Sequence, residues 1–184
     1  MRGKSHTELG NYLIWQYMPD IPSHYKSAFL LGCVQPDKNP ATYLKGSLRH
    51  QWLRGHNYLN ARRFMTRLSQ RLEKKTALSL IDYYTLGKLI HYTADAFTAA
   101  HNEFFKNSLR DHRQYEASLQ QYFLTYLHSK PVPDVIGAQT IMEGINSCHR
   151  EYRTAAADVR RDSLFALKAC CCILAVLLSP RVVF

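Results

Sequence analysis

The chain has 184 residues, of which 46% are hydrophobic and 21% are charged, and this balance is ordinary for one soluble globular domain over residues 1–184. The formal net charge of +10 favours partners that carry phosphate, such as nucleic acid, anionic lipid or phosphoesters, without choosing among them. The first residues lack the apolar core of a secretion signal, which argues against secretion and predicts a cytoplasmic protein.

The N-terminal quarter is expected to hold two helices and a loop. Ser5 to Glu8 is typical of a capping box, which predicts a helix from Ser5 to about Met18 with His6 in its first turn. A short helix is expected from Ser23 to Gly32. Prolines then punctuate residues 33–45 and indicate a loop, in which Asp37 lies.

Three further helices are predicted in the middle of the chain, over residues 57–75, 76–100 and 111–127. Gly87 inside the second costs about 1 kcal/mol relative to Ala, and we expect it to permit close packing. The first carries a basic stripe, which is either a solvated face or a contact for anionic membrane or nucleic acid. The stripe consists of Arg63, Arg67, Arg71 and Lys74.

The C-terminal region, residues 134–178, is predicted to be helical, with a break near 158–163. Its apolar run, 169–178, is shorter than the ~20 residues that a bilayer span needs, which favours a core helix over a membrane anchor. Cys170–Cys172 lie in this run. We interpret them as reduced, buried thiols, with lipidation or metal binding as the alternatives. The overall prediction is an all-α fold of six to eight helices.

Two histidine–carboxylate pairs point to a metal centre. His91 and Asp95 are four residues apart, as are His112 and Glu116, and His101 lies between the pairs. Residues at this spacing share one face of a helix, so each pair can direct two ligands at one point. The alternative for each pair is an ion pair without a metal, worth a few tenths of a kcal/mol.

Each pair completes only half of a tetrahedral zinc site, so further ligands must come from elsewhere. The candidates are His6 at a helix start, Asp37 in the predicted loop, and His50 or His56 after it. His50 is favoured, and His56 is the alternative to it or an outer partner of the site.

The order of these residues resembles the zinc-dependent phospholipase C family, whose zinc chemistry is shared with single-strand-specific zinc nucleases. The resemblance covers residues 5–116 and rests on five segments. They are Ser5-His6, Gly32 to Asp37, a following histidine, the run His91 to Asp95 with His101, and His112 to Glu116. It implies a multi-helix bundle of that family's type.

The resemblance also implies a set of zinc ligands for two or three ions. One zinc would be held by Asp37, His50, His91 and Asp95, with His50 close to the family's spacing after Asp37. A second would be held by His101, His112 and Glu116. A third would be held by His6 with Asp95 as a bridge. Secreted members add a mature N-terminal tryptophan to the third site, and here no Trp precedes His6.

The function that the resemblance implies is phospholipase C-like hydrolysis of a phosphodiester. Clustered zinc ions lower the pKa of a bound water towards ~7 and neutralise charge that develops on a phosphoryl group. Asp95 would bridge two ions, and Asp37 would bind zinc and orient the attacking water. The substrate would be a lipid or small phosphodiester, with peripheral contact to an anionic membrane. The alternatives are a single-strand nuclease with the same ions and a non-catalytic metal-binding or interaction protein.

Overall fold

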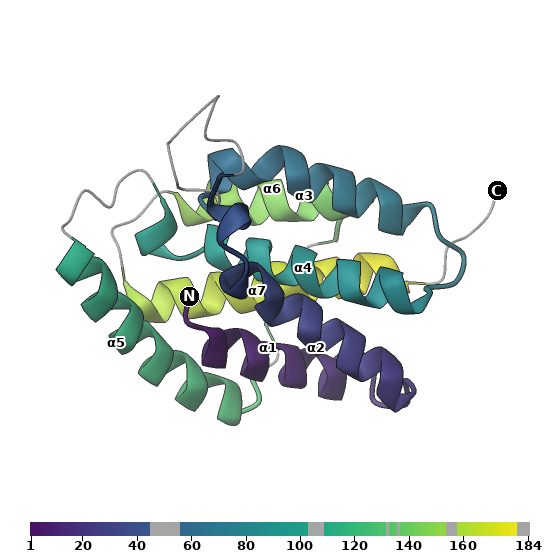
Figure 1. Ribbon diagram of the computed structural model, residues 1–184, viewed down its shortest axis with the longest axis horizontal. Coiled ribbons are helices and arrows are strands. Elements are labelled where there is room, and N and C mark those ends of the chain that lie inside the picture. Colours follow the sequence, from purple (N-terminus) through teal and green to yellow (C-terminus); the bar gives the residue numbers. More distant parts are fainter. Residues whose placement is uncertain (45–55, 103–108, 132, 136, 154–157, 180–184) are drawn as a thin grey trace.

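The described residues form an all-α structure, as predicted (Figure 1). The computed structural model describes residues 1–44, 56–102, 109–131, 133–135, 137–153 and 158–179. The elements of this part of the chain are α1 (Gly3–Tyr17), α2 (Ser23–Lys38), η1 (Pro40–Leu44), α3 (Tyr58–Glu73), α4 (Leu80–Ala96), η2 (Ala99–His101), α5 (Leu109–His128), α6 (Ile141–Tyr152) and α7 (Val159–Leu178).

Helices α4 and α7 form the centre of the bundle and pack against each other. On one side α2 covers α4 and α1 packs on α2, while on the other side α3 contacts α4 and α6 contacts α7. Helix α5 packs along α7 and α1 (Figure 1). The apolar faces of α4 and α7, including Leu86, Leu89, Ile173 and Leu174, are fully buried in this core.

The close approach of α2 and α4 depends on two glycines that face each other. A Cβ atom at Gly87 would lie 2.1 Å from the carbonyl oxygen of Phe29, and one at Gly32 would lie 2.2 Å from that of Tyr84. Such distances are far below van der Waals contact, so only glycine fits at either position. The crossing brings the end of α2 against the C-terminal half of α4, where His91 and Asp95 lie.

The predicted start of the first helix was wrong. Helix α1 begins at Gly3 after the extended residue Arg2, whose side chain makes no cap hydrogen bond. Ser5 therefore lies inside the helix, where its hydroxyl is buried against the core instead of capping the helix end. His6 consequently sits in the second half of the first turn and is fully buried.

The predicted loop over residues 33–45 was also wrong, because α2 continues through Pro36 to Lys38. A proline in the last turn of a helix removes only one backbone donor, and burial of Cys33 and Pro36 offsets that loss. Asp37 is thus held on a helix. A 3₁₀ turn follows at η1, where the Thr42 hydroxyl donates to the carbonyl oxygen of Pro36 at 2.7 Å.

The C-terminal region differs from the predicted helical span 134–178 in its bounds. Helix α6 begins only at Ile141, where the Thr140 side chain accepts a hydrogen bond from the Glu143 N–H. Helix α7 begins at Val159, capped by Asp158, so the predicted break at 158–163 extends too far into the helix.

The apolar run at the end of α7 is a core helix, as predicted. Its three cysteines are free thiols and buried, as are Cys33 and Cys148. Within the described part of the chain, no helix combines the length and apolar character that a membrane span requires. Helix α7 is packed against α4, α5 and α6, so more than one of its faces is buried. This burial accounts for the nearly continuous apolar sequence of its C-terminal half.

Candidate metal centre

Helix α4 places His91 and Asp95 one turn apart on its buried face, and neither side chain is exposed. His91 Nδ1 lies 2.8 Å from the carbonyl oxygen of Cys33 on α2. Because a carbonyl can only accept, Nδ1 carries a proton, and in the neutral ring Nε2 is then the nitrogen with the lone pair. Nε2 faces Asp95 Oδ2 at 3.3 Å. The tautomer is thereby fixed for metal binding, as is usual for histidine ligands with an outer hydrogen bond.

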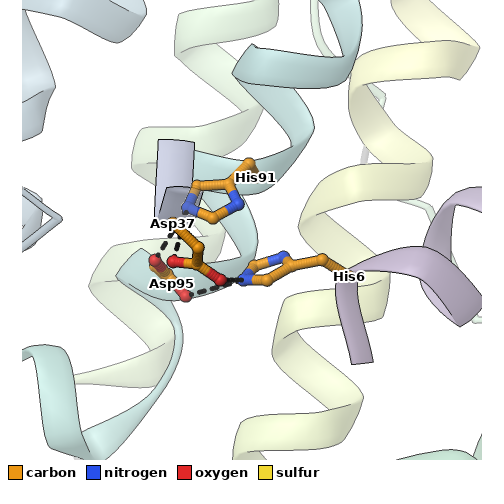
Figure 2. Close-up of side chains that lie close together, drawn as sticks. All are labelled: His6, Asp37, His91 and Asp95. Atoms are coloured by element: carbon orange, nitrogen blue, oxygen red, sulfur yellow. Dashed lines mark ion pairs between the residues drawn. The ribbon is translucent and has the colours of Figure 1, made fainter. Parts of the chain in front are cut away.

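Asp37 reaches the same point from the end of α2. Its Oδ1 lies 3.6 Å from His91 Nε2, and its Oδ2 lies 4.0 Å from His6 Nε2 (Figure 2). Its side chain is 24% exposed, whereas those of His6, His91 and Asp95 are fully buried. Asp37 therefore forms the solvent-facing side of this group.

His6 enters from α1 and stacks on the His91 ring, with ring centroids 3.9 Å apart. Its Nε2 lies 3.2 Å from Asp95 Oδ1, but neither ring nitrogen of His6 makes a hydrogen bond of acceptable geometry with any described residue. A fully buried imidazole without hydrogen bonds is costly unless another group satisfies it. A cation bound between His6 and the carboxylates would do so.

His56 lies in the centre, directly before the Asn57 cap of α3, and is 3% exposed. Its Nδ1 is 2.9 Å from Asp95 Oδ2 and 3.1 Å from His91 Nε2. Its Nε2 is 3.0 Å from the Thr42 hydroxyl. His50, the histidine favoured from the sequence, lies outside the described residues.

A second group comes from η2 and α5. His112 and Glu116 are one turn apart on α5, with His112 Nε2 3.6 Å from Glu116 Oε1, and His101 Nε2 lies 3.8 Å from the same oxygen. His101 Nδ1 lies 3.4 Å from Asp95 Oδ1. Asp95 therefore contacts histidines of both groups.

The amino group of Met1 also lies in the centre, a contact that the sequence did not signal. Its nitrogen donates to Asp95 Oδ1 at 2.6 Å and lies 3.4 Å from Glu116 Oε1. Burial works against the charge on this group, but the two carboxylates prevail and raise its pKa. In this charged state the nitrogen has no lone pair for a metal, so it acts as a hydrogen-bond donor to Asp95 where the two groups meet.

The electrostatics of the cluster keep its carboxylates ionised. Burial favours the protonated acids, but the Met1 amino group and the surrounding imidazoles hold the pKa of Asp95 well below its usual range. For Glu116, burial is likewise outweighed, by a hydrogen bond from His112 and by the Met1 amino group, and its pKa falls to about 2. Both carboxylates are thus available as anionic ligands at neutral pH.

Two imidazoles of the cluster, by contrast, are kept uncharged. Burial and the neighbouring His91 lower the pKa of His6 to about 3, and burial and the Met1 amino group lower that of His101. Neutral imidazoles offer the lone pair that a metal needs. Burial and the charge of Asp95 raise the pKa of Asp37, which suits a group that accepts a proton.

Two sets of donor atoms are close enough to hold metal ions. Nitrogen and carboxylate oxygen atoms of His6, Asp37, His91 and Asp95 lie within 4.8 Å of one another, as do those of His101, His112 and Glu116. Imidazole and carboxylate are the donors that zinc takes alongside thiolate. The residues present therefore fit zinc, with His56 beside the first set and Asp95 between the two.

A family model described as zinc-dependent phospholipase C matches residues 5–159 of this chain. The chain belongs to the zinc-dependent phospholipase C family. No curated protein and no solved structure gives a significant match. The matched range contains every histidine and carboxylate of both sets. A zinc-dependent phospholipase C is a hydrolase, so family and site agree on hydrolytic, zinc-dependent chemistry in general.

Proposed function

We propose that this chain hydrolyses phosphodiesters, with a phospholipid as the substrate, through two or three zinc ions held by the two sets of donors. The observation that carries the proposal is the position of Asp95. Its Oδ2 lies against His56 and His91, and its Oδ1 lies against His6 and His101. A shared carboxylate can hold ions close enough for one phosphate group to contact both.

We propose that the ligands are those expected from the sequence, with His56 taking the place given there to His50. The first ion would be held by Asp37, His56, His91 and Asp95, and the second by His101, His112 and Glu116. His6 and Asp95 would hold a third, with the Met1 nitrogen beside them. Support for His56 comes from its burial and from its contacts with Asp95 and His91.

Zinc bound in these positions would supply a water of lowered pKa and positive charge against the phosphoryl oxygens. The protein's own residues would orient the ligand side chains and accept a proton from the attacking water. Asp37, on the solvent-facing side, is positioned to accept a proton from the attacking water, and its raised pKa fits that role. Cys33 fixes the His91 tautomer through its carbonyl oxygen.

The test is zinc content per chain, measured by elemental analysis on untagged protein purified without chelator, followed by turnover of soluble phosphodiesters and short-chain phospholipids. We expect two or three zinc per chain and phospholipid hydrolysis. His56→Ala should lose zinc, and His50→Ala should retain it. A chain that takes up no zinc would contradict the proposal. Cleavage of single-stranded polynucleotide in preference to lipid would favour the nuclease alternative.

We also propose that the basic stripe binds an anionic lipid surface. Part of it lines an open groove of about 470 Å³, formed by Arg67, Gln70, Arg71, Lys74 and Lys75. Arg71 donates to Asp82 Oδ1 at 3.1 Å, which ties the groove to the first turn of α4. Leu80 and Ile81, beside Asp82, are 48% and 62% exposed. Basic side chains next to exposed aliphatic ones suit a lipid surface better than a polynucleotide.

The membrane proposal predicts binding to vesicles of phosphatidylserine and phosphatidylcholine, and little binding to phosphatidylcholine alone. Each basic residue near such a surface contributes about 1 kcal/mol, so Arg67→Gln with Lys74→Gln should weaken binding roughly thirty-fold. Arg150→Gln with Arg160→Gln removes the same charge from exposed positions on α6 and α7 and serves as the control. Equal weakening by both double variants would mean that only net charge matters.

A further inference from the structure

A buried carboxylate on α7 contacts the elements that carry the second set of donors. Asp162 is 1% exposed, and it lies outside the range matched by the family model. Its Oδ2 accepts two hydrogen bonds of 2.7 Å, one from the Ala99 N–H and one from the Tyr115 hydroxyl. Its Oδ1 accepts one from the Tyr152 hydroxyl, also at 2.7 Å.

Two of these three bonds reach residues within two positions of a proposed zinc ligand. Ala99 begins η2, which ends at His101, and Tyr115 directly precedes Glu116 on α5. A single oxygen of Asp162 therefore joins the two elements that supply the donors. Because η2 is only three residues long, it has little intrinsic rigidity, and the bond to Ala99 fixes its start.

Burial of the Asp162 carboxylate lowers the free energy of unfolding, so a role in stability does not account for its presence. Within the described residues it has no cationic partner, since Arg161 instead lies over the rings of Tyr152 and Phe165. Neutral donors only partly compensate the burial of a carboxylate, and an apolar residue in its place would avoid the cost. Three short bonds to elements far apart in the sequence indicate that the carboxylate organises its surroundings.

We propose that Asp162 is a positioning residue for the second zinc, acting through Ala99 and Tyr115 on His101, His112 and Glu116. This inference rests on the proposed function, because it requires zinc at those three residues. Outer partners of metal ligands typically contribute 10- to 100-fold to metal affinity. Asp162 touches no ligand side chain in this arrangement, so its effect is on the placement of donors and not on the chemistry.

The test compares two hydroxyl deletions on the same carboxylate. Tyr115→Phe removes the link to α5, whereas Tyr152→Phe removes a bond of the same length from α6, which carries none of the proposed ligands. Zinc affinity of each site is measured by titration against a competing chelator, and stability by chemical denaturation of the zinc-free chain. The full chain is used throughout, with Asp162→Asn as a third variant.

A positioning role and a purely structural role predict opposite orders for the loss of zinc affinity in Tyr115→Phe and Tyr152→Phe. Tyr152 is 2% exposed and Tyr115 is half-buried, so a structural role would make Tyr152→Phe the more damaging change for both stability and zinc. Positioning predicts that Tyr115→Phe weakens zinc at His101, His112 and Glu116 about 10-fold and leaves zinc at the first set unchanged, while Tyr152→Phe lowers stability alone.

Four results would overturn the inference. If wild type binds zinc and Tyr115→Phe binds it equally well, the positioning role fails and the proposed function stands. If both tyrosine variants weaken zinc to the same extent, Asp162 has a structural role only. If wild type binds no zinc at His101, His112 and Glu116, both the inference and the two-site centre fail. Asp162→Asn should reproduce the Tyr115→Phe effect with a larger loss, and unchanged zinc binding in it would also count against the proposal.

Discussion

Replacing Asp95 with asparagine is expected to remove zinc and activity together. The amide has no charge to balance the cations, and Asp95 contacts both sets of donors, so the change should disturb both. We expect kcat/KM to fall by more than about 100-fold, the upper end of the range for outer partners of a metal, and zinc per chain to fall in parallel. Elemental analysis and hydrolysis of a soluble phosphodiester are the measurements.

The control for this variant is Asp134→Asn, an equal change of charge at an exposed aspartate away from the centre. It should keep wild-type zinc content and activity. If Asp95→Asn retained full zinc stoichiometry, the bridging assignment would be wrong. Loss of activity with retained zinc would instead assign Asp95 a role in the reaction alone.

Gly87→Ala is expected to be among the most destabilising single substitutions in this chain. The new methyl group would lie 2.1 Å from the Phe29 carbonyl oxygen and 2.8 Å from the Cys33 nitrogen, both backbone atoms that cannot rotate away. We expect a loss of more than about 3 kcal/mol in the free energy of unfolding, despite the gain of about 1 kcal/mol in helix propensity. Chemical denaturation of the zinc-free chain measures it.

Gly137→Ala is the matched control, because a Cβ atom there would meet nothing within 4 Å. Zinc affinity should fall in Gly87→Ala as well, since separating α2 from α4 moves Asp37 away from His91 and removes the Cys33 bond that fixes the His91 tautomer. A variant as stable as wild type would show that the helices can shift apart at little cost.

The parts of the fold and site that depend on local pattern could be predicted from the sequence. The His91–Asp95 and His112–Glu116 pairs follow from the helical period, and close packing at Gly87 follows from a glycine inside an otherwise apolar helix. The start of α4 also carries a local signal. Ser79 and Asp82 form a reciprocal capping box, which marks the helix start better than the predicted Thr76.

The parts that depend on contacts between distant segments could not be predicted. Gly32 and Pro36 predict a loop at Asp37 because these residue types usually end helices, whereas burial against α4 keeps α2 helical to Lys38. The choice between His50 and His56 has no local signal, because the stretch before α3 has no helical or strand period. Asp162 likewise lies more than 60 residues from Ala99 in the chain, so no spacing rule connects them. The single-domain assignment stays a prediction.

The five buried thiols give this chain a built-in chemical probe of its own unfolding. Burial raises the pKa of Cys33, Cys148, Cys170, Cys171 and Cys172, so each stays protonated at neutral pH. A protonated, inaccessible thiol reacts slowly with alkylating reagents. Modification must then wait for the core around α7 to open, and its rate reports how often opening occurs. Counting modified cysteines over time would follow core opening in wild type and in every variant above without any added label.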